Sequence, residues 1–580
     1  MNLTKYGTAE AYDRFLPYDD PPKTVVINGL SGGMGDTFSL LLNMASSDES
    51  VRSVSAPKDA VFDGGFDEGA VTDAKYADGV FLFRKGHTLY ALKDGVFSVV
   101  GEKGMLSEEQ GVIYDYQQRF HVIDGEVIFA VDRALNIEVI EQNIPVCFKD
   151  VSRNGAVYTE IAPMNPFCRY IDIMLSDEAS NEQKFPLSFA VDNTYARAWH
   201  ADGKEVYPGY VMVREDRVIF DGDNAAGCRL RLRLLDAKDP SVYSFSQTAD
   251  YRALLSRSTS AVVTLAENKT MLLIANGTEI AGVLLTDGFA FHSADAVFRY
   301  DCLQTVTDVV AFDDGYLLFF EDAVKKLTVR EDENSISFSV LPFKNDFGSD
   351  MSGSIVCVDD KIVFASAKGG VCCIDRYGIS ERAECKKISF NIEDGEYGFF
   401  SHAAKEYETA SAFAAFGQYY LTVGDVTYVW DYRAKFPTDA QTRADEREMV
   451  WHLNDALLSQ KYLAFLDGKL YYTEKDTGKI RYVERKGGKV SCKMKTRDLD
   501  FGILGTKTLI ECGVRYRAES AVRLSISCDE NPYIDAYTFP ASKMHSVRTV
   551  RTYGKRFGTL SLLLECEGET EIDAMIFRFL

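Results

Sequence analysis

A short sequence motif recurs along this chain: an apolar strand, a tight turn with Asp or Gly, and a second strand rich in aromatic residues. Clear examples are residues 81–97, 121–132 and 309–320, and the motif occurs again at 355–375, 413–431 and 463–483. Asp-Gly turns such as Asp94-Gly95 and Asp467-Gly468 tolerate the positive φ that two-residue hairpins need. The pattern predicts an all-β chain built from antiparallel hairpins.

The spacing of the motif along the chain indicates how these hairpins are grouped. In the second half of the chain the motif recurs at intervals of about 45–55 residues, which is the length of one propeller blade. A single four-stranded sheet cannot bury both of its faces, so successive sheets are expected to pack against one another. The sequence therefore predicts a β-propeller, and an array of β-sandwiches with ordinary hairpins is the alternative.

The series of motifs is interrupted between about residues 145 and 300. Within this gap, Arg229 to Leu234 alternates Arg and Leu, as in a strand with one face in water. We expect an all-β chain with five parts: an N-terminal arm over 1–60, first propeller blades over 61–145, an inserted β-sandwich over 146–250, the remaining blades over 251–489, and a C-terminal β-sandwich over 490–580.

The charge of the chain limits its partners. The 580 residues carry a formal net charge of −23, which disfavours general DNA binding because phosphate contacts need Lys and Arg. Residues 491–580 differ, since they hold about as many basic as acidic residues. In that region Arg548, Arg551, Lys555 and Arg556 cluster near a predicted turn. They form either a solvated turn or a docking face for an acidic neighbouring subunit, and Arg229, Arg231 and Arg233 allow the same two interpretations.

The twelve cysteines show no metal-binding spacing, and no CxxC pair occurs. Several lie in apolar runs, which is typical of reduced, buried thiols in a protein made in a cytoplasm. The first residues lack the apolar segment of a secretory signal, and no apolar run is long enough for a membrane helix. We expect no membrane insertion.

No motif in the sequence predicts catalysis or a cofactor. The glycine-rich run from Val26 to Thr37 has Asp36 where a phosphate loop has Lys, so nucleotide binding is disfavoured. The seven histidines have no zinc spacing, and Asp221-Gly222-Asp223-Asn224 lacks the complete set of calcium ligands. The sequence thus predicts a protein that is not an enzyme, with no catalytic, metal or cofactor residues.

The order of several weak motifs resembles one family. Gly32-Gly33 is followed by Leu42-Asn43-Met44 and Val51-Arg52-Ser53, and the exit from the last blade reads Met494 to Gly502 and then Lys507. In this order they resemble the β-propeller virion proteins of tailed phages, known as packaged-DNA stabilization or tail nozzle proteins. One departure is Ala56-Pro57-Lys58, where the family has Arg-Pro-Gly. The similarity extends over nearly the whole chain.

The resemblance implies a virion structural protein, made in the host cytoplasm, that forms a ring with copies of itself, six in the implied assembly. Such a ring lies at the portal–tail or nozzle region, contacts other neck, portal or tail proteins, and continues or closes the DNA exit channel. DNA passes through it transiently, and an acidic lumen suits this passage because it repels DNA. The subunit interface is predicted at Gly32 and Gly33 in the arm and at Arg548, Arg551, Lys555 and Arg556.

A second hypothesis comes from a different class of protein. Propeller channels commonly hold ligands at one mouth, so the chain is alternatively a cytoplasmic β-propeller that binds a ligand or acts on a glycan. The two hypotheses differ in the assembly they predict, because the first requires a closed ring and the second does not.

Overall fold

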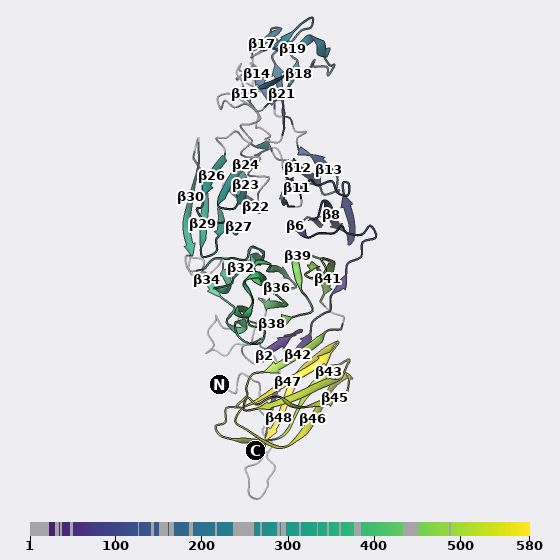
Figure 1. The fold of residues 1–580 in the computed structure, drawn as a ribbon, viewed down its shortest axis with the longest axis vertical. Coiled ribbons are helices and arrows are strands. Elements are labelled where there is room, and N and C mark those ends of the chain that lie inside the picture. Colours follow the sequence, from purple (N-terminus) through teal and green to yellow (C-terminus); the bar gives the residue numbers. More distant parts are fainter. Residues whose placement is uncertain are drawn as a thin grey trace. The chain divides into compact units, whose positions relative to one another are not determined.

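A computed structural model describes the chain over residues 22–28, 34, 38–46, 50–108, 110–125, 127–140, 144, 146–149, 160–161, 168–184, 190–214, 217–235, 260–266, 269–286, 290–291, 297–312, 315–332, 335–344, 347–358, 361–375, 384–432, 450–485 and 489–580. Strands dominate these residues (Figure 1), and the helical segments among them are short, such as α2 (Ala404–Glu408). The prediction of an all-β chain is confirmed. Two compact units are present, Phe62–Asp346 in one and Met1–Val61 with Phe347–Leu580 in the other.

The unit Phe62–Asp346 begins with two four-stranded antiparallel meanders. The first consists of β6 (Val71–Ala77), β7 (Val80–Lys85), β8 (Thr88–Lys93) and β9 (Val96–Val100), and the second of β10 (Val112–Tyr116), β11 (Arg119–Asp124), β12 (Val127–Asp132) and β13 (Ile137–Val139). Asp94-Gly95 has positive φ at both turn residues, as the sequence predicted for this hairpin, and Asp78-Gly79 between β6 and β7 adopts the same conformation. Apolar side chains of both meanders share one core.

Two further meanders complete this unit. One contains β22 (Ser260–Ala266), β23 (Lys269–Asn276), β24 (Glu279–Thr286), β25 (Ala290–Phe291) and β26 (Val297–Asp301), and the other β27 (Asp308–Phe312), β28 (Gly315–Phe319), β29 (Val324–Asp332) and β30 (Ser335–Lys344). The first strands of the four meanders are neighbours in the order β6, β10, β22 and β27. β10 thus lies beside β22, although a long insertion separates them in the sequence.

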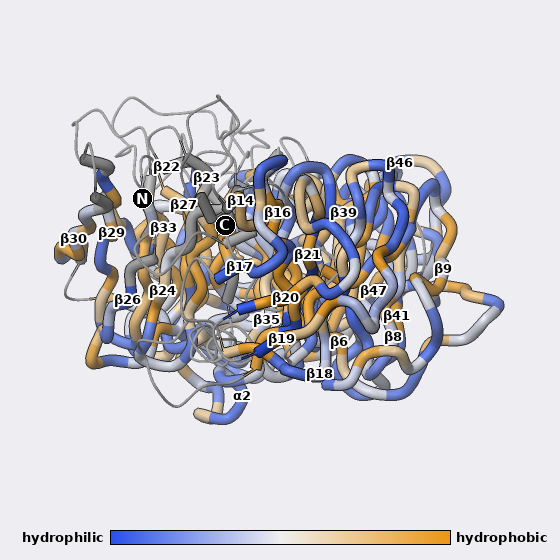
Figure 2. Tube along the Cα trace, turned by 90° about the horizontal axis from the view of Figure 1, so that it is seen from above, coloured by the Kyte–Doolittle hydropathy of each residue, from blue (hydrophilic) through white to orange (hydrophobic). Residues whose placement is uncertain are grey.

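The insertion has its own pair of sheets and its own core. The larger sheet has the order β15 (Glu160–Ile161), β14 (Val146–Lys149), β16 (Tyr170–Leu175), β21 (Arg229–Leu234) and β18 (Val191–Trp199), and the smaller one β17 (Glu182–Lys184), β20 (Arg217–Phe220) and β19 (Val211–Arg214). The Leu residues of β21 are buried and its Arg residues are not, as predicted. Figure 2 shows hydrophilic and hydrophobic stretches of the chain interleaved around the labels β20 and β21.

The other unit contains three meanders. They are β31 (Val356–Val358), β32 (Lys361–Ser366), β33 (Gly370–Asp375) and β34 (Glu384–Lys387); then β35 (Ser411–Ala415), β36 (Gln418–Val423), β37 (Val426–Asp431) and β38 (Trp451–Asn454); then β39 (Ser459–Leu466), β40 (Lys469–Glu474) and β41 (Ile480–Glu484). The last meander gains its fourth strand from far upstream, because β5 (Lys58–Asp59) pairs with β41. Lys58 Nζ lies 2.5 Å from Glu484 Oε2 at this junction.

Both ends of the chain build the remaining two sheets of this unit. One sheet has the order β3 (Met44–Ser46), β4 (Val51–Ser53), β48 (Thr570–Phe579), β43 (Lys507–Ala518) and β46 (Ser542–Phe557), with β1 (Lys23–Asn28) also paired to β48. The other has β2 (Phe38–Leu42), β42 (Ser491–Thr496), β47 (Leu560–Glu567), β44 (Val522–Cys528) and β45 (Ile534–Phe539). We call the first of these, which contains β46, the terminal sheet.

The two sheets enclose a common core. Phe501 belongs to this core, with its ring centroid 4.8 Å from that of Phe579 and 5.0 Å from that of Phe577. β2 also pairs in parallel with β38, which joins the second sheet to the meander β35–β38. The described part of the segment predicted as an N-terminal arm therefore supplies strands β1 to β5 to three different sheets.

Candidate subunit interface

The four basic residues predicted to form an interface all lie on β46. Arg548, Arg551, Lys555 and Arg556 follow one another along this strand, which pairs with β43. The predicted turn at this place is wrong, because β46 continues as a strand to Phe557.

A β-bulge explains why the strand is not interrupted there. The register of β46 against β43 shifts between the pairs Leu509–Lys555 and Glu511–Arg551. Gly554 lies in this shift with φ of +76°, a conformation that costs glycine little. A glycine with positive φ, of the kind common in turns, is therefore accommodated inside a long strand.

The structure brings the basic residues onto one strand but not onto one face. Arg551 lies opposite Glu511, and Arg548 lies opposite Val514. Because successive side chains in a strand point to opposite faces, residues three apart lie on different faces of the sheet. The side chains of Arg548 and Arg551 therefore lie on opposite faces of the terminal sheet. The other predicted interface residues, Gly32 and Gly33, lie outside the described residues.

A network of ion pairs ties the N-terminal segment to the last strand on the terminal sheet. The mostly buried carboxylate of Glu571 lies 2.6 Å from Arg52 Nη2 and 3.0 Å from Arg517 Nη2, and it accepts a hydrogen bond from Ser50. Burial opposes ionisation of Glu571, but the hydrogen bonds from Ser50 and Arg52 outweigh it and keep its pKa below the usual value. No sequence pattern indicated this contact, because Arg52 and Glu571 are far apart in the chain.

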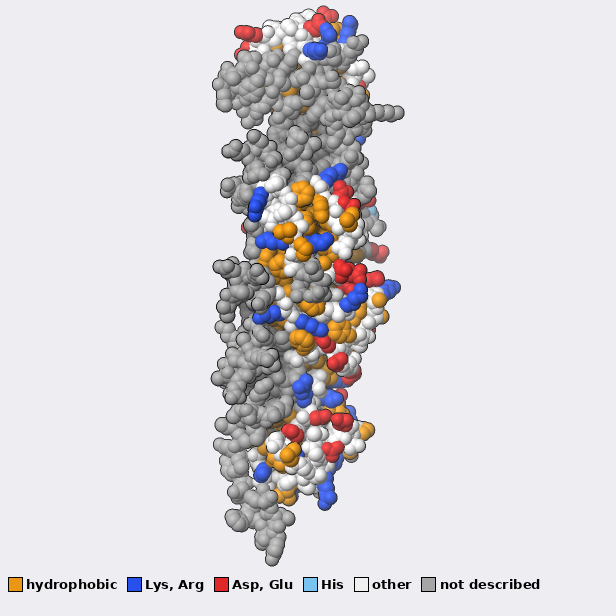
Figure 3. All heavy atoms as spheres, turned by 90° about the vertical axis from the view of Figure 1, so that its left-hand side faces the viewer, with side chains coloured by type: hydrophobic (Ala, Val, Ile, Leu, Met, Phe, Trp, Pro, Cys, Tyr) orange, Lys and Arg blue, Asp and Glu red, His pale blue; other side chains and the backbone are white. Residues whose placement is uncertain are grey.

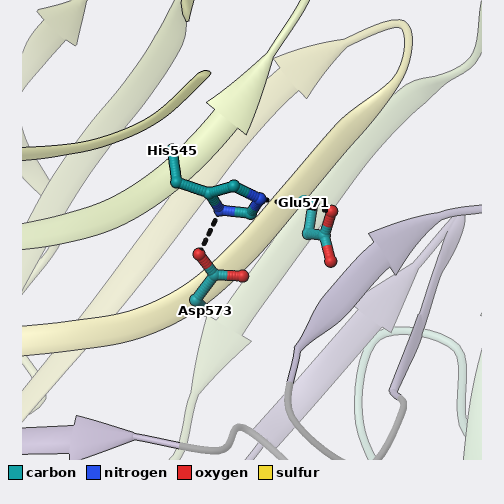
Figure 4. Close-up of side chains that lie close together, drawn as sticks. All are labelled: His545, Glu571 and Asp573. Atoms are coloured by element: carbon teal, nitrogen blue, oxygen red, sulfur yellow. Dashed lines mark hydrogen bonds and ion pairs between the residues drawn. The ribbon is translucent and has the colours of Figure 1, made fainter. Parts of the chain in front are cut away.

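His545, Glu571 and Asp573 form the one group with metal-ligand geometry among the described residues (Figure 4). The His545 ring contacts Asp573 through Nδ1, and its Nε2 lies 3.9 Å from Glu571. However, Arg52 and Arg517 already occupy Glu571, and Arg515 Nε lies 3.5 Å from Asp573. These guanidinium groups repel a divalent cation and use the carboxylate lone pairs. The arrangement is that of an ion-pair network rather than a metal centre.

The arginines of the insertion are paired within their own sheet. Arg231 makes a two-pronged contact with Asp172, with distances of 2.7 and 2.9 Å. Arg229 lies 3.7 Å from the same carboxylate, and both guanidinium groups lie over the ring of Trp199. Arg233 lies 3.7 Å from Asp192. Since each lies within ion-pair distance of a carboxylate of its own chain, these residues are less suited to docking than the exposed arginines of β46.

A cysteine, a histidine and an aspartate meet in the insertion, a cluster that the sequence did not reveal. Cys228 Sγ lies 3.4 Å from His200 Nδ1, and His200 Nε2 lies 3.2 Å from Asp223 Oδ2. This order resembles a nucleophile, base and orienting acid. However, Cys228 is fully buried, and burial raises the pKa of its thiol. A nucleophile needs the thiolate and access to substrate, and a buried thiol with a raised pKa is poorly suited to either requirement.

The twelve cysteines all lie in the described part of the chain, and none forms a disulfide. Within the described residues, no helix has the length and apolar character needed to cross a bilayer. Where described side chains are visible in Figure 3, Lys and Arg are interspersed with Asp and Glu.

Comparisons with known proteins do not identify a family. No family model and no curated protein matches the sequence. Solved structures with some similarity include the computationally designed Ika8 protein, with 9% identity over 74% of this chain and 99% of that chain and a TM-score of 0.31. They also include the AfRom2 CNH domain, with 5% identity over 71% of this chain and 93% of that chain and a TM-score of 0.32. TM-scores this low carry no argument about fold or function.

Proposed function

We propose that this chain is a structural subunit of a tailed-phage virion. Copies of it assemble into a ring at the portal–tail or nozzle region. The ring continues or closes the DNA exit channel, contacts other neck, portal or tail proteins, and stabilises packaged DNA.

In this proposal the meanders are the blades of one β-propeller. Its support is that consecutive strands of the meanders pair antiparallel, with β25 and β26 both pairing with β24 in one of them. In addition, the first strands of consecutive meanders lie side by side within each unit. The pairing of β5 with β41 is a further support. A ring of sheets must be held closed, and a strand from upstream of the first meander that completes the last one links its two ends.

The insertion and the terminal region are proposed to be β-sandwiches. Each has two sheets, and the buried side chains of each pair of sheets share one core. The chain enters the insertion after the second meander and leaves it before the third. The first strands of these two meanders, β10 and β22, are nevertheless neighbours, so the insertion does not separate the two meanders in space. This arrangement lets an extra domain be added without disturbing the packing of adjacent blades.

The observation that carries the functional proposal is the order of these parts. Two meanders, a two-sheet insertion, five meanders and a terminal pair of sheets follow one another in the described residues. This is the order that the resemblance to phage propeller proteins implies. A net charge of −23 is compatible with a lumen through which DNA slides without sticking.

The test is the mass and symmetry of the purified full-length protein, measured by light scattering and negative-stain imaging. The proposal predicts a closed ring with a central channel and a mass about six times the 64.8 kDa of one chain. If assembly needs a template, the ring appears on addition of portal or neck protein. A chain that stays monomeric in both conditions contradicts the proposal. Such a result favours the cytoplasmic binding module or glycan-active enzyme, whose channel mouth is then screened for ligands.

A further inference from the structure

β46 is a long strand with one open side. It has 16 residues, and in the part of the chain that the structure describes it pairs with β43 alone. Strands of globular proteins typically have about 5–6 residues. The open side of an edge strand presents unpaired main-chain N–H and C=O groups that are able to bind another strand.

The side chains of β46 give this edge a strong positive charge. The strand contains no Asp or Glu, and its basic residues are Lys543, His545, Arg548, Arg551, Lys555 and Arg556. Arg548, Arg551 and Arg556 are exposed, and no described carboxylate lies within ion-pair distance of them. Met544 and Val547 are exposed by 79% and 55% and add apolar surface to the same strand. A basic edge with apolar side chains suits an acidic strand.

Charge also determines which surface fits. Two copies of β46 repel each other, because like charges directly opposite in a sheet are destabilising. A symmetric contact between the same strands is therefore disfavoured. A second copy of the chain nevertheless carries a net charge of −23 and so offers acidic surfaces elsewhere. Contact between two different surfaces of identical subunits is heterologous, and heterologous contacts form a ring when the rotation between neighbouring subunits closes.

We propose that the open edge of β46 is the surface on which a neighbouring copy of this chain docks, by adding an acidic strand to the terminal sheet. The inference rests on the proposed ring and names the surface that holds it together. Main-chain hydrogen bonds provide the affinity, and the arginines on both sides of β46 select an acidic partner strand.

The test compares two double variants of the full-length protein. Arg548→Glu with Arg556→Glu reverses two charges on β46, and their cross-strand neighbours Val514 and Thr508 are uncharged, so the reversal creates no repulsion within the sheet. Lys405→Glu with Lys479→Glu is the matched control, because both lysines are exposed and lie outside the terminal sheet, in α2 and between β40 and β41. Each pair changes the net charge by the same amount. Assembly is followed by light scattering, and folding by the melting temperature.

Hydrogen exchange provides a second measurement that does not depend on mutation. About every second N–H of an edge strand points away from its partner strand and exchanges with water. Strand addition protects these amides in the ring but not in the monomer. The expected result is slower exchange in β46 on assembly, with an increase of about tenfold or more in the concentration needed for assembly of the β46 variant alone.

The outcomes separate this inference from the proposed function. If a ring forms but exchange in β46 is unchanged and the β46 variant assembles like the control, the docking surface is wrong and the ring remains. If the wild-type protein forms no ring with or without template proteins, both fail. If both variants assemble poorly to the same extent, the effect is one of net charge, and the docking surface is again wrong.

Discussion

Arg84 and Asp124 form an ion pair in which both side chains are buried. Arg84 Nη2 lies 2.8 Å from Asp124 Oδ1, and the two side chains are 0% and 2% exposed. Arg84 belongs to β7 of the first meander and Asp124 to β11 of the second. The same carboxylate accepts hydrogen bonds from the backbone N–H groups of Ser107 and Glu108. One carboxylate thus links two successive sheets and the segment between them.

Removing one partner of this pair is expected to destabilise the unit that contains it. Asp124→Ala leaves a buried guanidinium without its counter-ion, and such changes typically cost about 3–5 kcal/mol. Replacing both residues, as in Arg84→Met with Asp124→Leu, removes the uncompensated charge and is expected to recover much of the loss. Chemical denaturation measures both. A single variant that loses less than about 1 kcal/mol contradicts the importance of the pair.

His452 is expected to make stability depend on pH. Burial lowers its pKa to about 4, whereas an unfolded histidine titrates near 6.5. Between these values the unfolded chain binds a proton that the folded chain does not, so the free energy of unfolding falls as the pH drops below 6.5. The effect amounts to about 2 kcal/mol at pH 5 relative to pH 8.

The variant His452→Gln has no such proton to bind. Its melting temperature should therefore change less between pH 8 and pH 5 than that of the wild type, whatever its stability at neutral pH. His87→Gln, at an exposed position, is the control and should retain the wild-type dependence. An unchanged pH dependence in His452→Gln contradicts the assignment.

Divalent cations are not expected to bind the group of His545, Glu571 and Asp573. Because arginines already neutralise these carboxylates, millimolar Zn²⁺ or Mn²⁺ should leave the melting temperature unchanged, and a chelator should have no effect. A saturable increase with metal that disappears in Asp573→Asn identifies a true metal site and overturns this interpretation.

Thiol labelling of the native protein should follow burial. Cys357 is exposed and should react first with a small maleimide, while Cys228 should react only after unfolding, because its thiol is buried and its pKa is raised. Mass spectrometry of the labelled peptides gives the order. Rapid labelling of Cys228 that depends on His200 indicates an accessible nucleophile and a catalytic role for the cluster.

Gly513 is expected to accept no side chain. A Cβ atom at this position of β43 would lie 2.1 Å from the carbonyl oxygen of Arg548 and 2.7 Å from Thr549 Cα. Gly513→Ala therefore forces β46 away from β43, at a typical cost of about 1–3 kcal/mol. Thermal unfolding and hydrogen exchange of β46 measure the effect. Unchanged exchange and stability mean that the two strands are not packed as described.

Much of the local structure could be predicted from the sequence. Asp94-Gly95 indicates a hairpin because few other dipeptides adopt positive φ at both positions, and the Arg–Leu alternation of β21 indicates which face is buried. Both signals act over a few neighbouring residues. The prediction of a turn near Arg548 to Arg556 failed, because a glycine inside a bulge, such as Gly554, has the same local signature as a glycine in a turn.

The sequence by itself determined that the chain forms antiparallel hairpins, where an insertion interrupts them, and which residues are basic in an acidic chain. Only the tertiary structure decided that β5 completes the last meander, that Arg52 reaches Glu571, and that Arg548 and Arg556 lie along an open strand edge. The physical reason is the range of the interactions. Turn preference and side-chain alternation depend on adjacent residues, whereas strand pairing and charge pairing between distant segments depend on how the whole chain buries its apolar surface.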